Sequence, residues 1–345
     1  MHLSNFDYEL PESLIAQQPL ERRDASRMLV LNRAEQTWKD SRFELFSEYV
    51  GPGDVIVINN TRVFPARLIG QREPSGGRVE VLLIRELEPS TWQALVRPAH
   101  RLKKGARLHF GNSTLRAEVL EPSDKRFRQL KFEGNVPLDA LINELGQTPL
   151  PPYIKRASGT SAEDKERYQT VFARKKGAIA APTAGLHFTP QVIEALLARQ
   201  ARFVEITLHV GYGTFEPVRV QEIEQHRVGA ESFQISEEAA HVINESRAQG
   251  GRIIAIGTTT SRALESAVNA EGRIESSERE TDLTITPGFK FRVTDALLTN
   301  FHLPRSSLLL LVCAFGGRDF TLEAYRYAVA AHFRFYSYGD CMLVI

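Results

Sequence analysis

The chain has 345 residues, enough for about two domains, and a formal net charge of +1. A chain of this length can fold without disulfides or metals, and Cys313 and Cys341 lie in apolar runs typical of buried thiols. The first twenty residues do not have the pattern of a secretory signal. The longest apolar run, 306–317, is shorter than the roughly 20 residues of a membrane span. We therefore expect a cytoplasmic protein, not a secreted or membrane protein.

The first third of the chain changes its pattern near residue 67. Before it, residues 43–49 predict a helical segment and the apolar run 54–60 predicts a strand. From about 67 to 135, short segments alternate apolar and polar residues and are separated by turn residues. This spacing predicts a small antiparallel β-barrel or sandwich. The alternating segments are 78–84, 91–97, 106–110, 115–121 and 126–132.

The same region is strongly basic, with ten Lys and Arg residues against three acidic ones between Arg97 and Lys131. A second basic group lies between Lys155 and Lys176. A solvated surface is one interpretation, and a polyanion partner such as RNA is the other. The ten are Arg97, Arg101, Lys103, Lys104, Arg107, Arg116, Lys125, Arg126, Arg128 and Lys131.

The rest of the chain alternates strands, loops and helices. Residues 136–146 predict a short helix, and the proline-rich stretch 148–156 predicts a stiff connector. The apolar runs 201–210 and 251–257 are typical of strands buried on both faces of a parallel sheet, and 340–345 predicts a closing strand. Amphipathic helices are predicted at 189–200, 236–251 and 321–333, with Thr189, Ser236 and Thr321 as N-caps.

The simplest architecture is an α/β sheet domain of residues 1–66 and 150–345. A small antiparallel β-barrel domain of residues 67–149 is inserted into it. The polar stretch 158–166 predicts a mobile surface loop.

In open α/β sheets, ligands bind outside the carboxyl ends of the strands, where loops meet helix N-termini. Four loops qualify for this position: 178–190, 210–219, 257–266 and 298–307. In the third, Thr258, Thr259 and Thr260 with their amides predict a site for an anionic group, to which Arg262 adds a planar fork. Ordinary helix capping is the simpler alternative for one threonine.

Gly211 and Gly213 do not form the dinucleotide fingerprint, because a third glycine and a following helix are missing. They indicate either close approach to a ligand or a β-bulge. His187, His209 and His302 lie on or beside three of the loops. A single such histidine is usually structural, but three in one crevice favour proton transfer. No ligand spacing predicts a metal, and no nucleophile elbow occurs.

At these loops the sequence resembles a known family, the S-adenosylmethionine:tRNA ribosyltransferase-isomerases of queuosine biosynthesis. The resemblance begins at FDYELPESLIAQQP and continues to the end of the chain. It is carried by NNTRVFPARL (59–68), PLPPYIKR (149–156), YQTVFARKKGAIAAPTAGLHFT (168–189), TLHVGYGTFEPVR (207–219), GTTTSRALES (257–266), TPGFKFRVTDALLTNFHLPRSSLLLLVCAF (286–315) and FYSYGDCM (335–342).

The resemblance implies an enzyme that transfers the ribosyl part of S-adenosylmethionine to the aminomethyl group of a 7-deazaguanine base. That base already occupies the wobble position of a tRNA. The ribose is isomerised to an epoxycyclopentanediol, which gives epoxyqueuosine, and adenine and methionine leave. S-adenosylmethionine is thus a co-substrate, with no further cofactor or metal expected. The partner is the tRNA, with the basic barrel as its platform, and we expect a monomer without a membrane partner.

From this resemblance and the loops, His187, His209 and Glu216 are the candidates for proton transfer. Thr258, Thr259 and Arg262 are expected to hold the methionine carboxylate or the ribose hydroxyls. The sequence does not decide which group is the base, and Tyr338 and Asp340 are further candidates. The substrate-binding candidates are Asn60, Thr61, Arg62, Thr183, Gly185, Gly211, Gly213, Thr258, Thr259, Arg262, Asn300 and His302.

The chain departs from the family pattern at two positions. Asp40 stands where relatives often carry a histidine. The family block H-x-M-H-x-E reads HRVGAE, which keeps His226 and Glu231 but has Gly229 for the second histidine. A catalytic role for that second histidine is therefore not expected here.

Two other functions fit parts of the sequence. One is a small-molecule transferase with no RNA partner, in which the barrel only covers the site. The other is a non-catalytic RNA-binding module, which the barrel alone would favour but the four loops would not. Salt-dependent tRNA binding separates the first of these from the family function.

Overall fold

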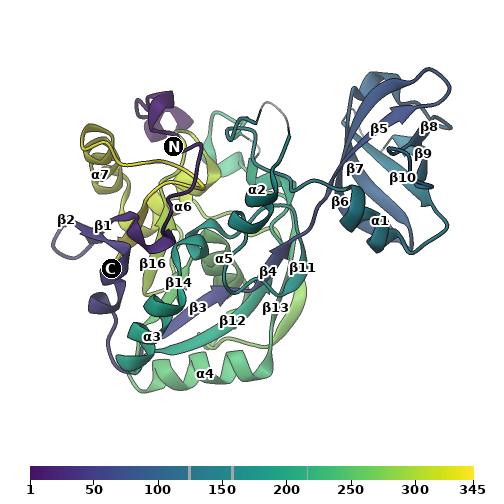
Figure 1. Ribbon diagram of the computed structural model, residues 1–345. Coiled ribbons are helices and arrows are strands. Elements are labelled where there is room, and N and C mark those ends of the chain that lie inside the picture. The colour runs from purple at the N-terminus through teal and green to yellow at the C-terminus, as the bar shows by residue number, and fades with distance from the viewer. Residues whose placement is uncertain (123–125, 157–158, 216) are drawn as a thin grey trace. The chain divides into compact units, whose positions relative to one another are not determined.

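The computed structural model describes residues 1–122, 126–156, 159–215 and 217–345 (Figure 1). The chain forms two compact units. Unit 1 comprises Met1–Arg62, Pro152–Lys155 and Arg167–Ile345, and unit 2 comprises Val63–Pro151 and Arg156–Glu166. The predicted fold class, an α/β sheet domain with an antiparallel β-barrel, is confirmed.

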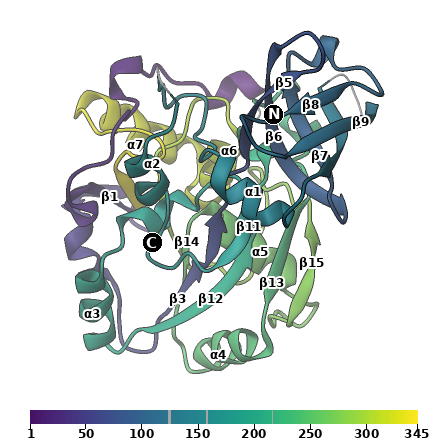
Figure 2. The same cartoon turned by 45° about the vertical axis from the view of Figure 1, so that its right-hand side comes forward.

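Unit 1 is built on a nine-stranded sheet with the order β15-β13-β12-β3-β14-β16-β17-β1-β2. Figure 2 shows β3, β12 and β13 side by side, and β4 (Thr61–Val63) pairs with β11 (Lys175–Ala178) in a separate ribbon. The sheet strands are β1 (Arg27–Asn32), β2 (Thr37–Arg42), β3 (Val55–Asn59), β12 (Arg202–Leu208), β13 (Glu231–Ile235), β14 (Ile253–Ile256), β15 (Ser277–Thr281), β16 (Ala296–Asn300) and β17 (Cys341–Val344).

The sheet is mixed. Strands β12, β3, β14 and β16 are parallel neighbours, so their carboxyl ends meet at one edge. The closing strand β17 runs antiparallel to β16 and parallel to β1, and β13 runs antiparallel to β12. The edge formed by the four parallel strands is where ligands bind in sheets of this kind.

Each central strand is buried on both faces, as its continuous apolar sequence predicts. In β3, Val55 and Val57 belong to one core and Ile56 and Ile58 to the other. Helices α4 to α7 cover the first face, and α3 covers the second with the 3-10 helices η4 (Phe43–Tyr49) and η6 (Thr183–His187).

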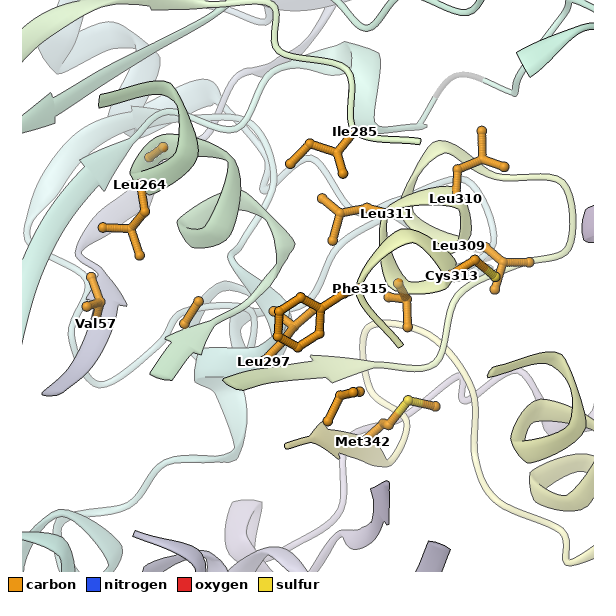
Figure 3. Close-up of a cluster of buried hydrophobic side chains, with 14 of the residues drawn as sticks. Val57, Leu264, Ile285, Leu297, Leu309, Leu310, Leu311, Cys313, Phe315 and Met342 are labelled. Carbon is orange, nitrogen blue, oxygen red and sulfur yellow. The ribbon is translucent and has the colours of Figure 1, made fainter. Parts of the chain in front are cut away.

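Figure 3 shows α6 placing Leu309, Leu311 and Phe315 above Leu297 of β16 and Met342 of β17. Cys313 lies in the same apolar cluster and is 1% exposed, and Cys341 is also buried, so both are buried thiols as predicted. No helix in the described part of the chain is long and apolar enough to cross a membrane.

The predicted N-caps are correct for two of the three helices. The Thr189 and Ser236 side chains accept hydrogen bonds from Val192 and Ala239, at the starts of α3 and α4. The prediction for Thr321 is wrong, because α7 begins three residues earlier, after Gly317 with its φ of +86°. The helices of unit 1 are α3 (Pro190–Ala198), α4 (Glu237–Ala248), α5 (Thr258–Ala267), α6 (Ser307–Gly316) and α7 (Arg318–Ala330).

Unit 2 contains a closed six-stranded barrel with the order β10-β7-β6-β5-β8-β9. All six strands lie within the predicted insert, residues 67–149. The first strand, β5, was not among the predicted segments. The elements are β5 (Arg67–Arg72), β6 (Gly77–Glu88), β7 (Thr91–Arg97), β8 (Arg107–His109), β9 (Arg116–Pro122), β10 (Phe127–Glu133), and the helices α1 (Leu138–Leu145) and α2 (Ala162–Arg167).

Two features of unit 2 differ from a simple basic surface with loops. Arg128 is buried, and its guanidinium donates to the carbonyls of Ala99 and Leu102, both at 2.7 Å. The predicted loop 158–166 is wrong for residues 162–166, which form most of α2, whereas residues 159–161 lie outside the helices and strands. There Ser161 and Asp164 cap each other through their backbone N–H groups, and Asp164 pairs with Arg156 at 2.7 Å. Lys125 lies outside the described residues.

Candidate functional site

A cavity lies at the edge where the four parallel strands end. We call it the main cavity. Its walls come from the segments 180–184 after β11, 257–259 after β14 and 299–302 at the end of β16, together with Val210 and Thr214 after β12. All four predicted loops therefore contribute to this cavity, the 210–219 loop through Val210 and Thr214.

Five of the predicted site residues line the main cavity: Thr183, Thr258, Thr259, Asn300 and His302. The threonines are placed by Gly257, which precedes α5 and has a φ of +93°, a conformation that favours glycine. Because α5 begins immediately after it, Thr258 and Thr259 present the first turn of the helix to the cavity. Thr260 does not line the cavity, since its hydroxyl donates to the Ile256 carbonyl at 2.8 Å.

Three polar atoms of this wall have no hydrogen-bond partner in the described chain. They are Oγ1 of Thr259, Oδ1 of Asn300 and the hydroxyl oxygen of Tyr168, in residues that are 7%, 2% and 0% exposed. A buried polar atom without a partner costs about 1–3 kcal/mol, and in native proteins it commonly marks a ligand or water position. All three atoms belong to residues that line the main cavity.

His187 lies behind Asn300 and lines a separate pocket with Ser26 rather than the main cavity. Its Nε2 lies 3.3 Å from Asn300 Nδ2, and its Nδ1 lies 2.7 Å from Ser26 Oγ. The amide nitrogen of Asn300 also donates to the Tyr336 carbonyl at 3.0 Å, so both described hydrogen bonds of the amide use Nδ2, and Oδ1 has no partner. Burial lowers the pKa of His187 to about 4, so its imidazole is neutral at pH 7. A neutral ring accepts from Asn300 through Nε2 and donates to Ser26 through Nδ1.

His302 lies in the wall itself. Its Nε2 is 2.8 Å from Thr299 Oγ1, its backbone N–H donates to the Tyr325 hydroxyl, and its carbonyl accepts from Tyr8. Burial lowers the pKa of His302 to about 3, so this imidazole is neutral as well. None of the described residues that line the main cavity carries a formal charge at pH 7.

A second cavity, the side cavity, shares Thr214 and Leu308 with the main one. It contains the predicted residues Gly213 and Arg262. Arg262 points to Glu231 of β13, and the guanidinium and carboxylate form an ion pair in which the side chains are 8% and 5% exposed. Arg262 thus reaches the neighbouring cavity rather than joining Thr258 and Thr259 in the main one.

His209 and Thr61 meet at the β4–β11 ribbon. Thr61 Oγ1 and His209 Nδ1 are 2.7 Å apart, and the ring packs on Gly177, where a Cβ atom would lie 2.6 Å from it. Burial lowers the pKa of His209. Arg62 is exposed on the same ribbon. None of these three residues lines the main cavity.

Asn60 lines a separate cleft beside β12 and α4, which is larger than the main cavity. Several of its polar side chains are partnered within the described chain. Asn60 donates to Glu205 and accepts from Thr207, and Lys175 donates to Gln234. The main cavity, where buried polar atoms remain unpaired, is therefore the stronger candidate for the ligand site.

The remaining predicted residues have supporting positions or are not described. Gly185 is buried against Thr170, only 2.9 Å from where its Cβ would stand, and does not line the main cavity. The N–H of Gly211 donates to Glu231 Oε1 at 2.8 Å. Asp340 accepts hydrogen bonds from two backbone N–H groups, and burial raises its pKa. Glu216 lies outside the described residues.

The sequence analysis did not select several residues of the main cavity. Tyr153, Tyr168, Tyr336 and Ser337 all line it. Burial raises the pKa of the three tyrosines, so their hydroxyls remain protonated donors at pH 7. Each lies in a sequence block that carries the family resemblance, and this was the signal that could have identified it. The sequence around a tyrosine does not tell whether its side chain lines a cavity or packs in the core.

The described residues contain no group of three or more His, Cys, Asp or Glu side chains that could hold a metal ion. The fold and the cavities thus define an α/β protein with a neutral, largely apolar small-molecule site at the carboxyl edge of its sheet.

Residues 3–344 match the family described as "Queuosine biosynthesis protein". Among curated proteins, the chain is 50% identical to the S-adenosylmethionine:tRNA ribosyltransferase-isomerase of Citrifermentans bemidjiense and 46% identical to that of Halothermothrix orenii, with full coverage of both chains. It is 40% identical to the S-adenosylmethionine tRNA ribosyltransferase of Thermotoga maritima, whose crystal structure aligns with a TM-score of 0.57 over 99% of this chain and 100% of that one.

The chain belongs to the queuosine biosynthesis protein family, which confirms the resemblance seen in the sequence. It is an enzyme, and its relatives are named as transferases that are also isomerases.

Proposed function

We propose that the chain transfers and isomerises the ribosyl moiety of S-adenosylmethionine onto the aminomethyl group of 7-aminomethyl-7-deazaguanine at the tRNA wobble position. The products are epoxyqueuosine in tRNA, adenine and methionine. The proposal rests on the family and on one structural observation. The loops of the sheet edge line a single cavity, and Thr259 Oγ1 and Asn300 Oδ1 are among the unpaired polar atoms of its lining residues.

The composition of the main cavity suits a sulfonium nucleoside. S-adenosylmethionine alkylates nucleophiles, and the described wall presents no thiol, carboxylate or amine that could be alkylated. Tyr153, Tyr168 and Tyr336 provide aromatic groups, which attract a cation without reacting with it. A wall of neutral, buried groups also keeps water from reactive intermediates.

The wall residues have distinct tasks in this reaction. Asn300 Oδ1 accepts a hydrogen bond from an N–H or O–H group of the nucleoside, and Thr259 donates or accepts beside it. The protonated tyrosines are donors for the departing adenine, which needs a proton or hydrogen bonds to leave. The neutral imidazole of His302 is the titratable nitrogen base among the described lining residues, which makes it a candidate to accept a proton there.

The reaction needs a base because the sulfonium acidifies the neighbouring 5′ carbon of the ribose. After removal of that proton, adenine departs and the RNA amine attacks the opened sugar, and methionine leaves when the bond between its sulfur and the 5′ carbon breaks. His187 acts from behind the wall in this scheme, by orienting Asn300. His209, at the β4–β11 ribbon, and Glu216 remain candidates for proton transfer that involves the RNA base.

The tRNA is proposed to bind through exposed cations of the barrel. Arg97, Arg101, Lys103, Arg107 and Lys131 are all exposed on unit 2. Each phosphate contact makes binding more salt-sensitive, so log K against log salt should be steep and should flatten by about 0.7–0.9 per cation removed. Arg62 and Lys176 are exposed on the β4–β11 ribbon. The salt dependence of tRNA binding, measured on variants that lack these two cations, tests whether the ribbon is a second binding surface.

The deciding experiment measures adenine release from S-adenosylmethionine by chromatography. One sample contains tRNA with the aminomethyl-deazaguanine base, a second contains the same tRNA with guanine, and a third contains no RNA. We expect stoichiometric adenine and methionine only with the modified tRNA, together with incorporation of the ribosyl carbons into RNA. Release that is independent of the RNA, or RNA that gains no ribosyl carbon, would overturn the proposal.

A further inference from the structure

The side cavity adjoins the main cavity and differs from it in charge. The two share Thr214 and Leu308 as wall residues, so a ligand with two parts joined by a short linker can occupy both. The described wall of the main cavity is neutral, whereas the side cavity contains the buried pair of Arg262 and Glu231. A buried ion pair is costly to desolvate and adds little stability compared with apolar residues, so its presence beside a ligand site calls for another explanation.

The guanidinium of Arg262 has one nitrogen left to donate. Its Nε donates to the Leu283 carbonyl at 3.0 Å, and its Nη1 donates to Glu231. Its Nη2 is buried and has no partner among the described residues. The Arg262 side chain is 8% exposed and lines the side cavity. A buried cationic N–H without an acceptor indicates a missing anionic or carbonyl oxygen.

The carboxylate of Glu231 can also accept a further hydrogen bond. Oε1 accepts from the Gly211 N–H at 2.8 Å and from Thr214 Oγ1 at 3.3 Å, and Oε2 accepts from Arg262. A carboxylate has about four acceptor positions, so one position on Oε2 remains. The pair therefore offers a donor and an acceptor of opposite charge to the same small space.

The rest of the side cavity is apolar. Its described wall includes Val228, Leu283, Ile285 and Leu311, and Figure 3 shows Ile285 and Leu311 close together at the edge of the α6 cluster. Gly229 also lines it, with no atom within 4 Å of where its Cβ would stand, so the cavity has open space on that side. Such a wall fits an unbranched aliphatic chain.

We propose that the side cavity binds the zwitterionic α-amino acid end of S-adenosylmethionine. Nη2 of Arg262 donates to the carboxylate, Oε2 of Glu231 accepts from the ammonium group, and the apolar wall contacts the methylene groups. The nucleoside then occupies the main cavity, with the sulfonium near Thr214 and Leu308. This inference rests on the proposed function, because it assumes S-adenosylmethionine as the ligand.

The first test compares ligands on the intact protein. The dissociation constants of S-adenosylmethionine and decarboxylated S-adenosylmethionine are measured by calorimetry, since these two sulfonium compounds differ only in the carboxylate. We expect the decarboxylated compound to bind about 10–100-fold more weakly, the value of one lost charged hydrogen bond. Equal affinities would overturn the proposal. This comparison uses the wild-type protein, so it does not depend on whether a variant folds.

The second test asks whether the Arg262–Glu231 pair causes the difference in affinity between the two ligands. The double variant Arg262→Gln/Glu231→Gln removes both charges together and leaves no single buried charge. In this variant we expect the affinity ratio of the two ligands to fall to about 1–3, because the carboxylate has lost its partner. A ratio that stays as in the wild type would mean that another group binds the carboxylate. Loss of structure is monitored by circular dichroism, and if the variant does not fold the ligand comparison decides.

A matched pair provides the control. Arg252 and Asp54 form an ion pair at 2.6 Å at the opposite edge of the sheet, with Asp54 buried. The double variant Arg252→Gln/Asp54→Asn should keep the wild-type affinity ratio even if it is less stable. A failure of the proposed function appears separately, as wild-type protein that binds both ligands but releases no adenine with the modified tRNA.

Discussion

The carboxylate of Asp54 lies at the amino ends of β3 and β14, where both of its oxygens accept hydrogen bonds from other residues of the chain. It accepts from the backbone N–H groups of Gly51 and Arg252, at 2.8 and 2.9 Å, and from the Arg252 guanidinium. At the carboxyl ends of the same sheet, Thr259 Oγ1, Asn300 Oδ1 and Arg262 Nη2 are as deeply buried but have no partner in the described chain.

The difference between these two edges shows which polar groups serve the fold and which serve the ligand. A buried polar group that the chain satisfies stabilises the folded state, whereas one left unpaired costs stability until a ligand satisfies it. Substitutions at the amino edge should therefore lower stability and keep turnover. Substitutions at the carboxyl edge should lower turnover with a smaller effect, or even the opposite effect, on stability.

The largest expected change follows Asp54→Ala. This substitution leaves Arg252 without its partner and two backbone N–H groups without an acceptor. We expect the free energy of unfolding to fall by about 3 kcal/mol, measured by urea denaturation. The kcat/KM of the folded fraction, measured well below the midpoint, should stay within about twofold of wild type. If the Asp54→Ala protein had normal stability but a low kcat/KM, the amino edge would serve the ligand rather than the fold, contrary to this assignment.

Asn300→Ala tests the carboxyl edge. It removes the unpaired Oδ1 and the donor that His187 accepts, so we expect kcat/KM to fall roughly 100-fold, the value of one or two lost hydrogen bonds. The variant should still fold, with about 1–2 kcal/mol lower stability because the Tyr336 carbonyl also loses its donor. Full turnover in a folded Asn300→Ala protein would remove Asn300 from the site.

The neutral histidines behind this edge predict a dependence of stability on pH. Burial lowers the pKa values of His187 and His302 to about 4 and 3, below their ordinary value of about 6.5 in the unfolded chain. The unfolded state therefore binds more protons, and the stability that these groups contribute is complete above pH 6.5 and is lost as the pH falls. His187 alone should account for about 2 kcal/mol between pH 8 and pH 5.

The measurement is a series of urea denaturations between pH 8 and pH 5. His187→Gln keeps a side chain that can bond to Asn300 and Ser26 but does not titrate. The slope of the free energy of unfolding against pH reports how many more protons the unfolded state binds. Near pH 5.5 we expect this number to be about one proton smaller in the variant than in the wild type. An unchanged slope would show that His187 titrates normally in the folded protein.

The sequence predicted the loops that meet at this edge because a simple rule governs them. Carboxyl ends of parallel strands come together, so segments after β14 and β16 had to meet. The same rule did not give the direction of long side chains. Arg262 lies one helical turn beyond Thr258 and was predicted to share its ligand contacts. The position of Glu231, on an antiparallel strand 31 residues away, decides instead that Arg262 points into the side cavity.

His187 illustrates a second limit. Its loop was recognised, but the sequence does not tell whether a histidine in a 3-10 turn faces a cavity or the residues behind it. Here the amide of Asn300, 113 residues away, takes one ring nitrogen and Ser26 the other. Tyr153 and Tyr336 show the reverse case, because both lie in recognised blocks and only the assembled cavity distinguishes them from core residues.

The smallest and most specific expectation concerns two adjacent threonines in the first turn of α5. Thr259→Val removes a hydroxyl that is buried without a partner, so we expect the stability of the free enzyme to stay the same or to rise by up to about 1 kcal/mol. Because the same hydroxyl is proposed to bond to the nucleoside, kcat/KM should fall roughly tenfold. Thermal unfolding and adenine release measure the two effects on one protein preparation.

Thr260→Val is the matched control, with the same chemical change one residue further on. The Thr260 hydroxyl is fully buried and donates to the Ile256 carbonyl, and the residue does not line the main cavity. This variant should lose about 1 kcal/mol of stability and keep its kcat/KM. The opposite signs of the two stability changes follow from a single difference, namely whether the protein or its substrate supplies the partner. Equal losses of stability in both variants would mean that Thr259 is paired within the fold and that the unpaired edge does not mark the ligand.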